Sequence, residues 1–174
     1  MKNLILAISA LPLAVVLAAC GGGGDGSADT AATASTAGTA TPAASTTAAK
    51  YAGTWGGCFS TAASSSRKET LVITAQGAET ASFSFSEANY AEPTCAGAAG
   101  TTSSDSGTIT FAGTKTMGTD TVDQATIAQA GGTQKQVMLV TGTSLMFGKQ
   151  AGDGGTLDAD GYPTSFEADP LSRL

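Results

Sequence analysis

Apolar and polar residues alternate without interruption in the segment 81–86, Ala-Ser-Phe-Ser-Phe-Ser. Successive side chains of an extended strand point to opposite faces, so this alternation predicts a strand with one buried and one solvated face. The segment 108–111 alternates in the same way and is expected to stop at Gly113, and the segment 71–74 is short, apolar and β-branched. Because no segment carries a convincing apolar stripe of helical spacing, the chain is expected to fold as β-sheet.

Five further segments complete this all-β pattern. The continuous apolar run 136–140 predicts a strand buried on both faces, and 144–147 returns after a Thr-Gly-Thr turn as the second strand of a hairpin. The segments 51–59 and 121–128 are weaker candidates, and 164–167 is the expected last strand. Short strands separated by glycine indicate an antiparallel sandwich or barrel. We expect a small antiparallel β-barrel of roughly eight strands.

The first twenty residues have the layout of a secretion signal. Lys2 gives a positive start, and an apolar run covers positions 4–17. A permanent membrane-spanning helix needs roughly 20 apolar residues, so this shorter run is typical of a signal peptide instead. The run ends in Leu17-Ala18-Ala19-Cys20.

This ending resembles the lipobox of bacterial lipoproteins. The resemblance implies a lipoprotein signal peptide over residues 1–19 and a lipid attached to the thiol of Cys20. Two or three acyl chains on one cysteine would hold the protein firmly to a membrane. Gly21 stands where an Asp often retains such proteins in the inner membrane, so we expect a cell-envelope protein anchored in the outer membrane. An ordinary secretory signal, cut near Ala18 or Ala19 and leaving a free Cys20, remains the alternative.

Residues 20–50 are expected to form the lipidated cysteine and a disordered tether. Nearly every residue from 27 to 49 is Ala, Thr, Ser or Gly, and no aromatic residue precedes Tyr51. Such a segment buries too little apolar surface to offset its ordering entropy. Residues 51–174 then form one β-barrel domain, since that length suits a single core.

Two cysteines fall inside this expected domain. Cys58 and Cys95 are an even pair in a compartment expected to be oxidising, which predicts one disulfide between them. Two buried free thiols are the alternative. A zinc site is disfavoured because the chain has no histidine to complete the usual ligand set.

The start of the first expected strand, Gly53-Thr54-Trp55, resembles the G-x-W signature of lipocalins and related calycin barrels. The resemblance implies that Gly53 admits close packing and that Trp55 closes one end of the barrel. The lipocalin T-D-Y element is absent. No arginine on a late strand is expected to cover Trp55, because Arg173 lies at the end of the chain. The positions of Cys58 and Cys95 also resemble those of small lipocalin-like domains of bacterial lipoproteins.

Composition argues against several classes of function. Without histidine the chain has neither a Ser-His-Asp triad nor a Cys-His pair, and we expect that it is not an enzyme and has no cofactor. The net charge is −6, and an acidic chain repels nucleic-acid phosphates, so no nucleic-acid partner is expected.

One segment partly matches a twelve-residue calcium loop. With Thr156 at position one, Asp158, Asp160 and Glu167 fall at positions three, five and twelve. Thr156 is a poor substitute for the leading carboxylate, so these three acids are weak metal candidates and no metal is expected. An Asp-Gly turn that leads into the last expected strand is the favoured explanation of the segment.

Two hypotheses for the function follow. The first is a structural or protein-contacting envelope barrel with a solid interior, and its partners are the membrane and an envelope protein. The alternative is a carrier module that binds a small apolar ligand or lipid in an open cavity. The first requires the interior to be filled by large apolar side chains, for which we expect Phe83, Phe85, Ile109, Phe111, Leu139 and Phe147.

Overall fold

The computed structural model describes residues 46–174. The expected signal peptide 1–19, the lipidation site Cys20 and most of the expected tether lie outside the described residues. The elements in chain order are α1 (Thr47–Tyr51), β1 (Gly53–Ala62), β2 (Ser65–Ala75), β3 (Thr80–Tyr90), β4 (Thr102–Met117), β5 (Asp120–Gln129), β6 (Gly132–Thr141), β7 (Ser144–Phe147), the 3-10 helix η1 (Ala151–Asp153) and β8 (Leu171–Arg173).

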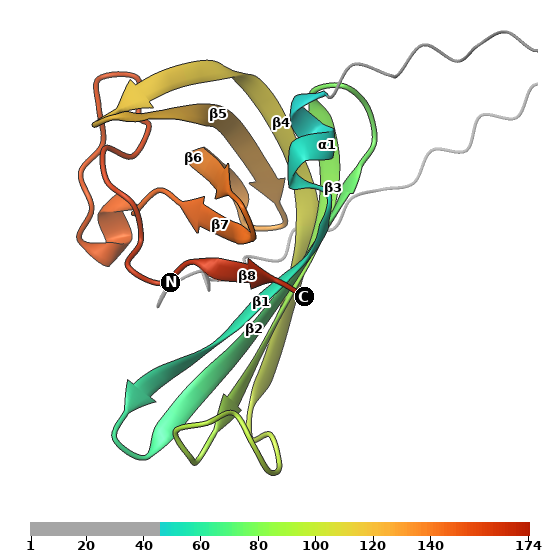
Figure 1. Cartoon of the computed structure of the whole chain (residues 1–174), viewed down its shortest axis with the longest axis vertical. Coiled ribbons are helices and arrows are strands. Elements are labelled where there is room, and N and C mark those ends of the chain that lie inside the picture. The colour runs from blue at the N-terminus through green and yellow to red at the C-terminus, as the bar shows by residue number, and fades with distance from the viewer. Residues whose placement is uncertain (1–45) are drawn as a thin grey trace, which may run out of the picture. The chain divides into compact units, whose positions relative to one another are not determined.

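The eight strands form a closed antiparallel barrel, as the sequence predicted. Each strand pairs with the next along the chain, and β8 closes the ring by pairing with β1 (Figure 1). Antiparallel neighbours need no crossover connection, which allows this simple up-and-down order. None of the helices within residues 46–174 is long and apolar enough to cross a membrane.

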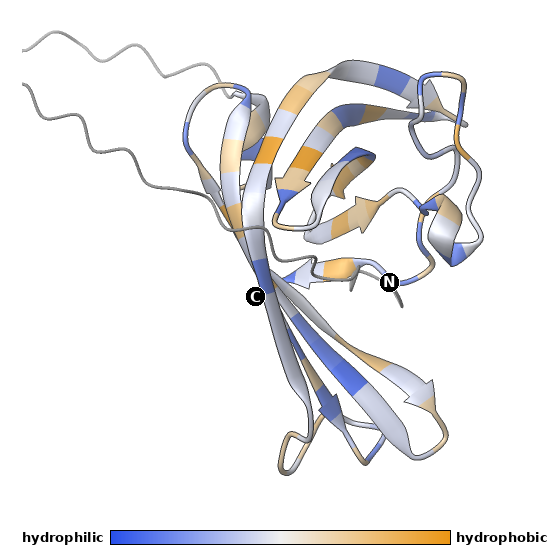
Figure 2. Ribbon diagram, turned by 180° about the vertical axis from the view of Figure 1, so that it is seen from behind, coloured by the Kyte–Doolittle hydropathy of each residue, from blue (hydrophilic) through white to orange (hydrophobic). Residues whose placement is uncertain are grey.

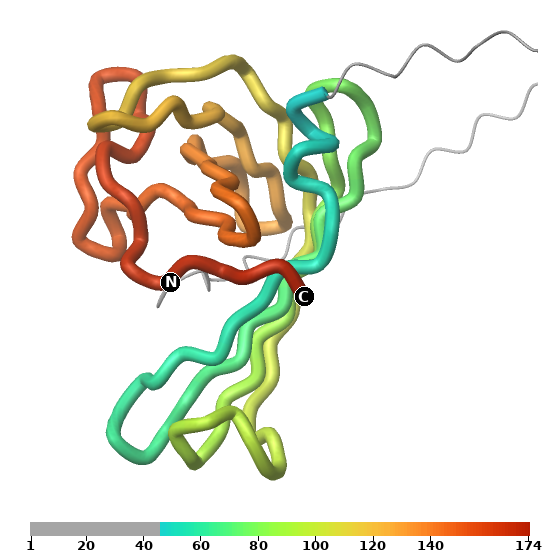
Figure 3. The backbone as a smooth tube through the Cα atoms, in the orientation of Figure 1, coloured from blue at the N-terminus to red at the C-terminus, as the bar shows by residue number. Residues whose placement is uncertain are grey.

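The first four strands continue well beyond the closed ring. β5 pairs with β4 only from Gly107 onward, and β8 pairs with β1 only at Trp55 and Gly56. The remaining parts of β1–β4 form a four-stranded sheet below the ring (Figures 1 and 3). We call this part the sheet extension; it comprises residues 57–62, 65–70, 84–90 and 102–106.

Alternation along the strands separates the inside of the barrel from its outside. In β2, Leu71 and Ile73 are buried, whereas Val72 between them is exposed. Figure 2 shows hydrophobic residues mainly on the strands of the closed ring, and the sheet extension is mostly neutral or hydrophilic. The amphipathic pattern therefore builds one main core inside the ring.

The apolar run in β6 is buried on both faces, as predicted. Met138 belongs to the main core, while its neighbour Val137 belongs to a second cluster with Val122 and Tyr162. Because adjacent strand residues point to opposite sides, this second cluster lies outside the barrel wall. Tyr162 comes from the segment between β7 and β8, which therefore covers that wall.

Two strand predictions are wrong in detail. Residues 164–167 are not a strand; only a single bridge joins Phe166 to Gly148, and the last strand is β8. β4 does not stop at Gly113 but runs on to Met117, because the pairing with β5 shifts register there. Gly113 has φ 128°, a conformation that other residues rarely adopt, so the glycine allows the bulge instead of ending the strand.

The folded domain also begins before Tyr51, the first aromatic residue, where its start was expected. Residues 47–50, expected in the tether, form α1 together with Tyr51. Ala48 and Tyr51 are completely buried in the main core. Tyr51, expected to open the first strand, is thus the last residue of a helix.

Candidate functional site

Helix α1 packs against one end of the barrel. The backbone N–H of Ala48 donates to the carbonyl of Ala78, in the turn between β2 and β3. The ring of Tyr51 stacks on that of Phe111, with 4.9 Å between centroids. This end of the barrel is therefore occupied by residues of the chain itself.

A polar network fixes the Tyr51 hydroxyl inside this end. Its oxygen lies 2.6 Å from Asp123 Oδ2 and 2.8 Å from the carbonyl oxygen of Met138. The Lys50 ammonium lies 2.7 Å from the same Asp123 oxygen. Burial, followed by the hydrogen bond and charge of Asp123, raises the pKa of Tyr51 far above its ordinary value. The two contacts of its hydroxyl tie α1 to β5 and β6.

Trp55 is a fully buried core residue whose ring is covered by Arg173. The expectation that no late arginine reaches Trp55 is wrong. Arg173 is in β8, directly opposite Trp55, and its guanidinium carbon lies 4.5 Å from the ring centroid. A Cβ atom on Gly53 would lie 3.0 Å from an Arg173 nitrogen, so the glycine admits this side chain. The indole N–H donates to the Tyr51 carbonyl over 2.8 Å.

Large side chains fill the interior of the ring. Of the six residues expected there, Phe83, Ile109 and Phe111 belong to the buried core, and Phe85 and Phe147 pack against it. Leu139 is an error, since it belongs to the outer cluster with Val122. The expected list lacked two of the largest buried side chains, Tyr51 and Trp55, which come from α1 and the start of β1.

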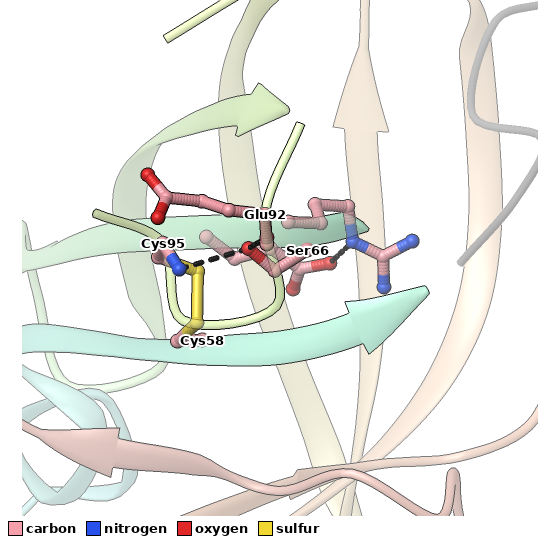
Figure 4. Close-up of a disulfide and its surroundings, with 6 residues drawn as sticks. Cys58, Ser66, Glu92 and Cys95 are labelled. Atoms are coloured by element: carbon pink, nitrogen blue, oxygen red, sulfur yellow. Dashed lines mark hydrogen bonds and ion pairs between the residues drawn. A yellow bond between two sulfur atoms is a disulfide. The ribbon is translucent and has the colours of Figure 1, made fainter. Parts of the chain in front are cut away.

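The predicted disulfide joins Cys58 and Cys95, whose Cα atoms are 5.9 Å apart. It fastens the loop after β3 to the outer face of β1 (Figure 4). The buried Ser66 hydroxyl holds the same loop, donating to the Glu92 carbonyl over 2.6 Å and accepting from the Cys95 N–H over 2.8 Å. The bond and the serine together order a loop that has no regular secondary structure.

A buried ion cluster on the inner face of the sheet extension was not predicted. Arg67 Nε lies 2.6 Å from Glu69 Oε1 and 3.6 Å from Glu87 Oε2. The Glu69 side chain is completely buried, yet within residues 46–174 neither of its oxygens accepts a well-aligned hydrogen bond. Glu69 is two residues before Leu71 and shares its inward face, a signal that the predicted strand at 71–74 was too short to include.

Glu69 makes stability depend on pH. Burial raises the pKa of its carboxyl, and the Arg67 charge offsets part of the rise. The folded state therefore holds this proton more firmly than the unfolded chain, whose pKa is near 4.5. The stability that Glu69 contributes is complete below that value and is lost as the pH rises through the folded pKa.

We expect Glu69→Gln to raise the free energy of unfolding at about pH 8 and to change it little at about pH 4. Urea denaturation at both pH values measures this difference, and Glu167→Gln is a control with the same change of charge. A larger loss of stability at the higher pH than at the lower would contradict the assigned burial of a charged carboxyl.

The weak metal candidates do not gather around a common point. Asp158 Oδ2 lies 2.5 Å from the Lys115 ammonium, and its Oδ1 accepts the N–H groups of Asp160 and Tyr162. The Lys115 hydrogen bond lowers the pKa of Asp158. In the part of the chain from residue 46 onward, no three acidic or cysteine side chains are placed to hold a metal ion. Asp158 thus organises a turn, and Glu167 takes no part in it.

Two adjoining shallow cavities of about 430 and 490 Å³ lie on the outer face of β2–β4. Thr70, Ser86 and Ser104 line both of them. Ligand pockets for apolar molecules are enclosed and mainly apolar. These hollows lie outside the barrel wall and are open to solvent, so neither is an enclosed cavity within the ring.

Comparison of the chain with protein-family models, with curated proteins and with solved structures found no match. The barrel has a filled ring, an end closed by α1 and a sheet extension that projects beyond the ring.

Proposed function

We propose that this protein is a lipid-anchored component of the cell envelope with a non-enzymatic, structural or protein-contacting role. The observation that supports it most is the filled interior of the ring. Trp55, Tyr51, Ile109 and Met138 are all buried members of the main core. Barrels of about eight strands are just wide enough for side chains to fill, so a solid interior is a stable solution for this size.

We further propose that the barrel is lipocalin-like in architecture and does not act as a carrier. Gly53 and Trp55 at the start of β1, with Arg173 packed over the indole from β8, support this description. A carrier function would need an apolar cavity inside the ring. Native mass spectrometry of protein extracted from its own membrane tests the point. We expect the mass of the protein alone, and one apolar ligand per domain would overturn the structural role.

The proposed anchor is the lipid on Cys20, and Gly21 after it favours the outer membrane. We expect Cys20→Ser to abolish lipidation, cleavage by the lipoprotein signal peptidase and acyl anchoring. Mass spectrometry of the N-terminus, combined with membrane fractionation, measures all three. Ser35→Ala leaves the lipobox intact and is the control, which should stay acylated. Unmodified wild-type protein, cut elsewhere and recovered in the soluble fraction, would show that the leader is an ordinary secretory signal.

A further inference from the structure

The loop that carries Cys95 crosses β2 to reach β1. β3 ends at Tyr90, which is paired with Ser66 of β2, and the disulfide then joins Cys95 to Cys58 on the other side of that strand. Ser66 lies beneath the loop where it crosses (Figure 4). Its side chain is therefore buried, although it is on the outer face of the sheet extension.

The contacts of Ser66 with this loop do not involve the sulfur atoms. Its hydroxyl donates to the Glu92 carbonyl and accepts the Cys95 N–H. Cys95 has φ 53°, a left-handed conformation that residues other than glycine seldom adopt, so contacts from its surroundings must hold it there. The serine can therefore keep Cys95 in place before the disulfide exists.

The disulfide lies apart from the residues that stabilise the barrel. Within residues 46–174, neither cysteine belongs to the main core or to the outer cluster around Val122. The pairing of β1 with β2 and of β2 with β3 places Cys58, Ser66 and the start of the loop together, and it depends on backbone hydrogen bonds. The barrel can therefore form before the bond does.

The two cysteines differ in access from solvent. Cys58 is exposed on the outer face of β1, beyond the last residue that pairs with β8. Cys95 is only half-exposed in the loop above Ser66. Thiol–disulfide exchange requires contact between the attacking thiolate and a sulfur of the other molecule, so its rate depends on access. Cys58 is the cysteine that a donor reaches first.

We propose that Cys58 accepts a disulfide from an oxidised donor and that Cys95, positioned by Ser66, completes the transfer within the folded barrel. In the first exchange the Cys58 thiolate attacks one donor sulfur, forms a Cys58–donor disulfide and releases the other donor sulfur as a thiolate. In the second, the Cys95 thiolate attacks the Cys58 sulfur and releases the remaining donor sulfur. The two cysteines lose two protons and two electrons, and the donor disulfide is reduced to two thiols.

Ser66 is a positioning residue that acts on the second exchange. Its hydrogen bonds hold Cys95 beside Cys58, with 5.9 Å between their Cα atoms, and groups held together react faster than free ones. The first exchange needs only an accessible Cys58. This inference rests on the proposed envelope location, because disulfides are formed in oxidising compartments. Its test follows chemistry in purified protein, so its failure leaves the proposed anchor and solid barrel to their own tests.

The experiment reduces the full-length protein in a mild detergent, removes the reductant and adds oxidised glutathione. Circular dichroism should show the same β-sheet content before and after oxidation. Acid quenching and peptide mapping by mass spectrometry should show closure of the bond with little glutathione adduct. Cys95→Ser should stop with glutathione on Cys58. Cys58→Ser should react at Cys95 about fivefold more slowly, because that thiol is less accessible.

Ser66→Ala separates the two exchanges. It should slow closure of the bond by about tenfold, the equivalent of one lost hydrogen bond, and let the Cys58–glutathione adduct accumulate, while the first exchange keeps its rate. Ser104→Ala removes an exposed hydroxyl from the outer face of β4 and should change neither step. The cysteine variants keep Ser66 and so test the order of attack even if Ser66→Ala does not fold.

A peptide closed by a Cys-x-x-Cys disulfide, at the same concentration as glutathione, distinguishes the two sources of the donor. Faster transfer from the peptide would identify a protein donor, and faster transfer from glutathione a small molecule. Glutathione found mainly on Cys95, a reduced chain that has lost its β-sheet, or closure in Ser66→Ala at the wild-type rate would each overturn the proposal.

Discussion

Replacement of Trp55 by alanine should lower the free energy of unfolding by about 3–5 kcal/mol, the usual range for losing a large buried aromatic side chain. Trp55 is completely buried. The Arg173 guanidinium packs over one face of its ring, and its indole N–H donates a hydrogen bond to the Tyr51 carbonyl. The variant removes this packing and leaves that carbonyl without its donor. Because Trp55 is the only tryptophan, unfolding should be followed by circular dichroism in urea.

Two milder variants separate the contributions of this site. Trp55→Phe keeps most of the ring but removes the N–H, and a lost hydrogen bond to a buried carbonyl costs about 1–3 kcal/mol. Arg173→Met keeps an apolar chain over the indole and removes the cation, which should cost about 0.5–2 kcal/mol. If Trp55→Ala reduced stability by less than about 1 kcal/mol, the indole would not be the core anchor described above.

Loss of the Cys58–Cys95 bond should destabilise the protein by about 2–5 kcal/mol. The cysteines are 37 residues apart, and closing a loop of that length in the unfolded chain contributes about 4 kcal/mol in the chain-entropy model. Cys58→Ser, compared with the wild type with and without reductant, measures the effect by chemical denaturation. The reduced wild type and the variant should agree.

The place of the bond also predicts where its loss acts first. It fastens a loop to the sheet extension, away from the core around Trp55 and Tyr51. Hydrogen exchange should therefore rise in residues 91–101 before it rises in the ring strands. Labelling of denatured, unreduced protein provides the control. Two reactive thiols per chain would contradict the bond, and equal acceleration throughout the barrel would contradict a local role.

Much of the fold followed from local patterns. The alternation in 81–86 fixed a strand because neighbouring side chains of extended backbone must face opposite sides. The run 136–140 indicated burial on both faces, which β6 has. Two cysteines in an expected oxidising compartment were enough to predict the disulfide. These properties depend on residues close in sequence, or on a count, and so were available without the tertiary structure.

Contacts between distant segments were beyond those patterns. Arg173 covers Trp55 only because β8 closes the ring beside β1, which brings the end of the chain to its beginning. The inward direction of Glu69 depends on strand pairing that continues past the ring. The Arg173–Trp55 contact and the inward direction of Glu69 both depend on ring closure and strand register, because a shift of one residue would turn every side chain of a strand to the other face.

The all-β class, the approximate strands and the disulfide could therefore be predicted from the residues alone, because side-chain alternation and cysteine pairing act locally or by composition. Three features are visible only in the folded barrel: α1 closes one end with Tyr51, the interior is filled, and β8 pairs with β1 no further than Gly56. Each of them depends on which distant backbone groups and side chains meet when the eight strands close. Within residues 46–174, closure pairs β8 with both β7 and β1 and leaves the two edges of the sheet extension without a neighbouring strand.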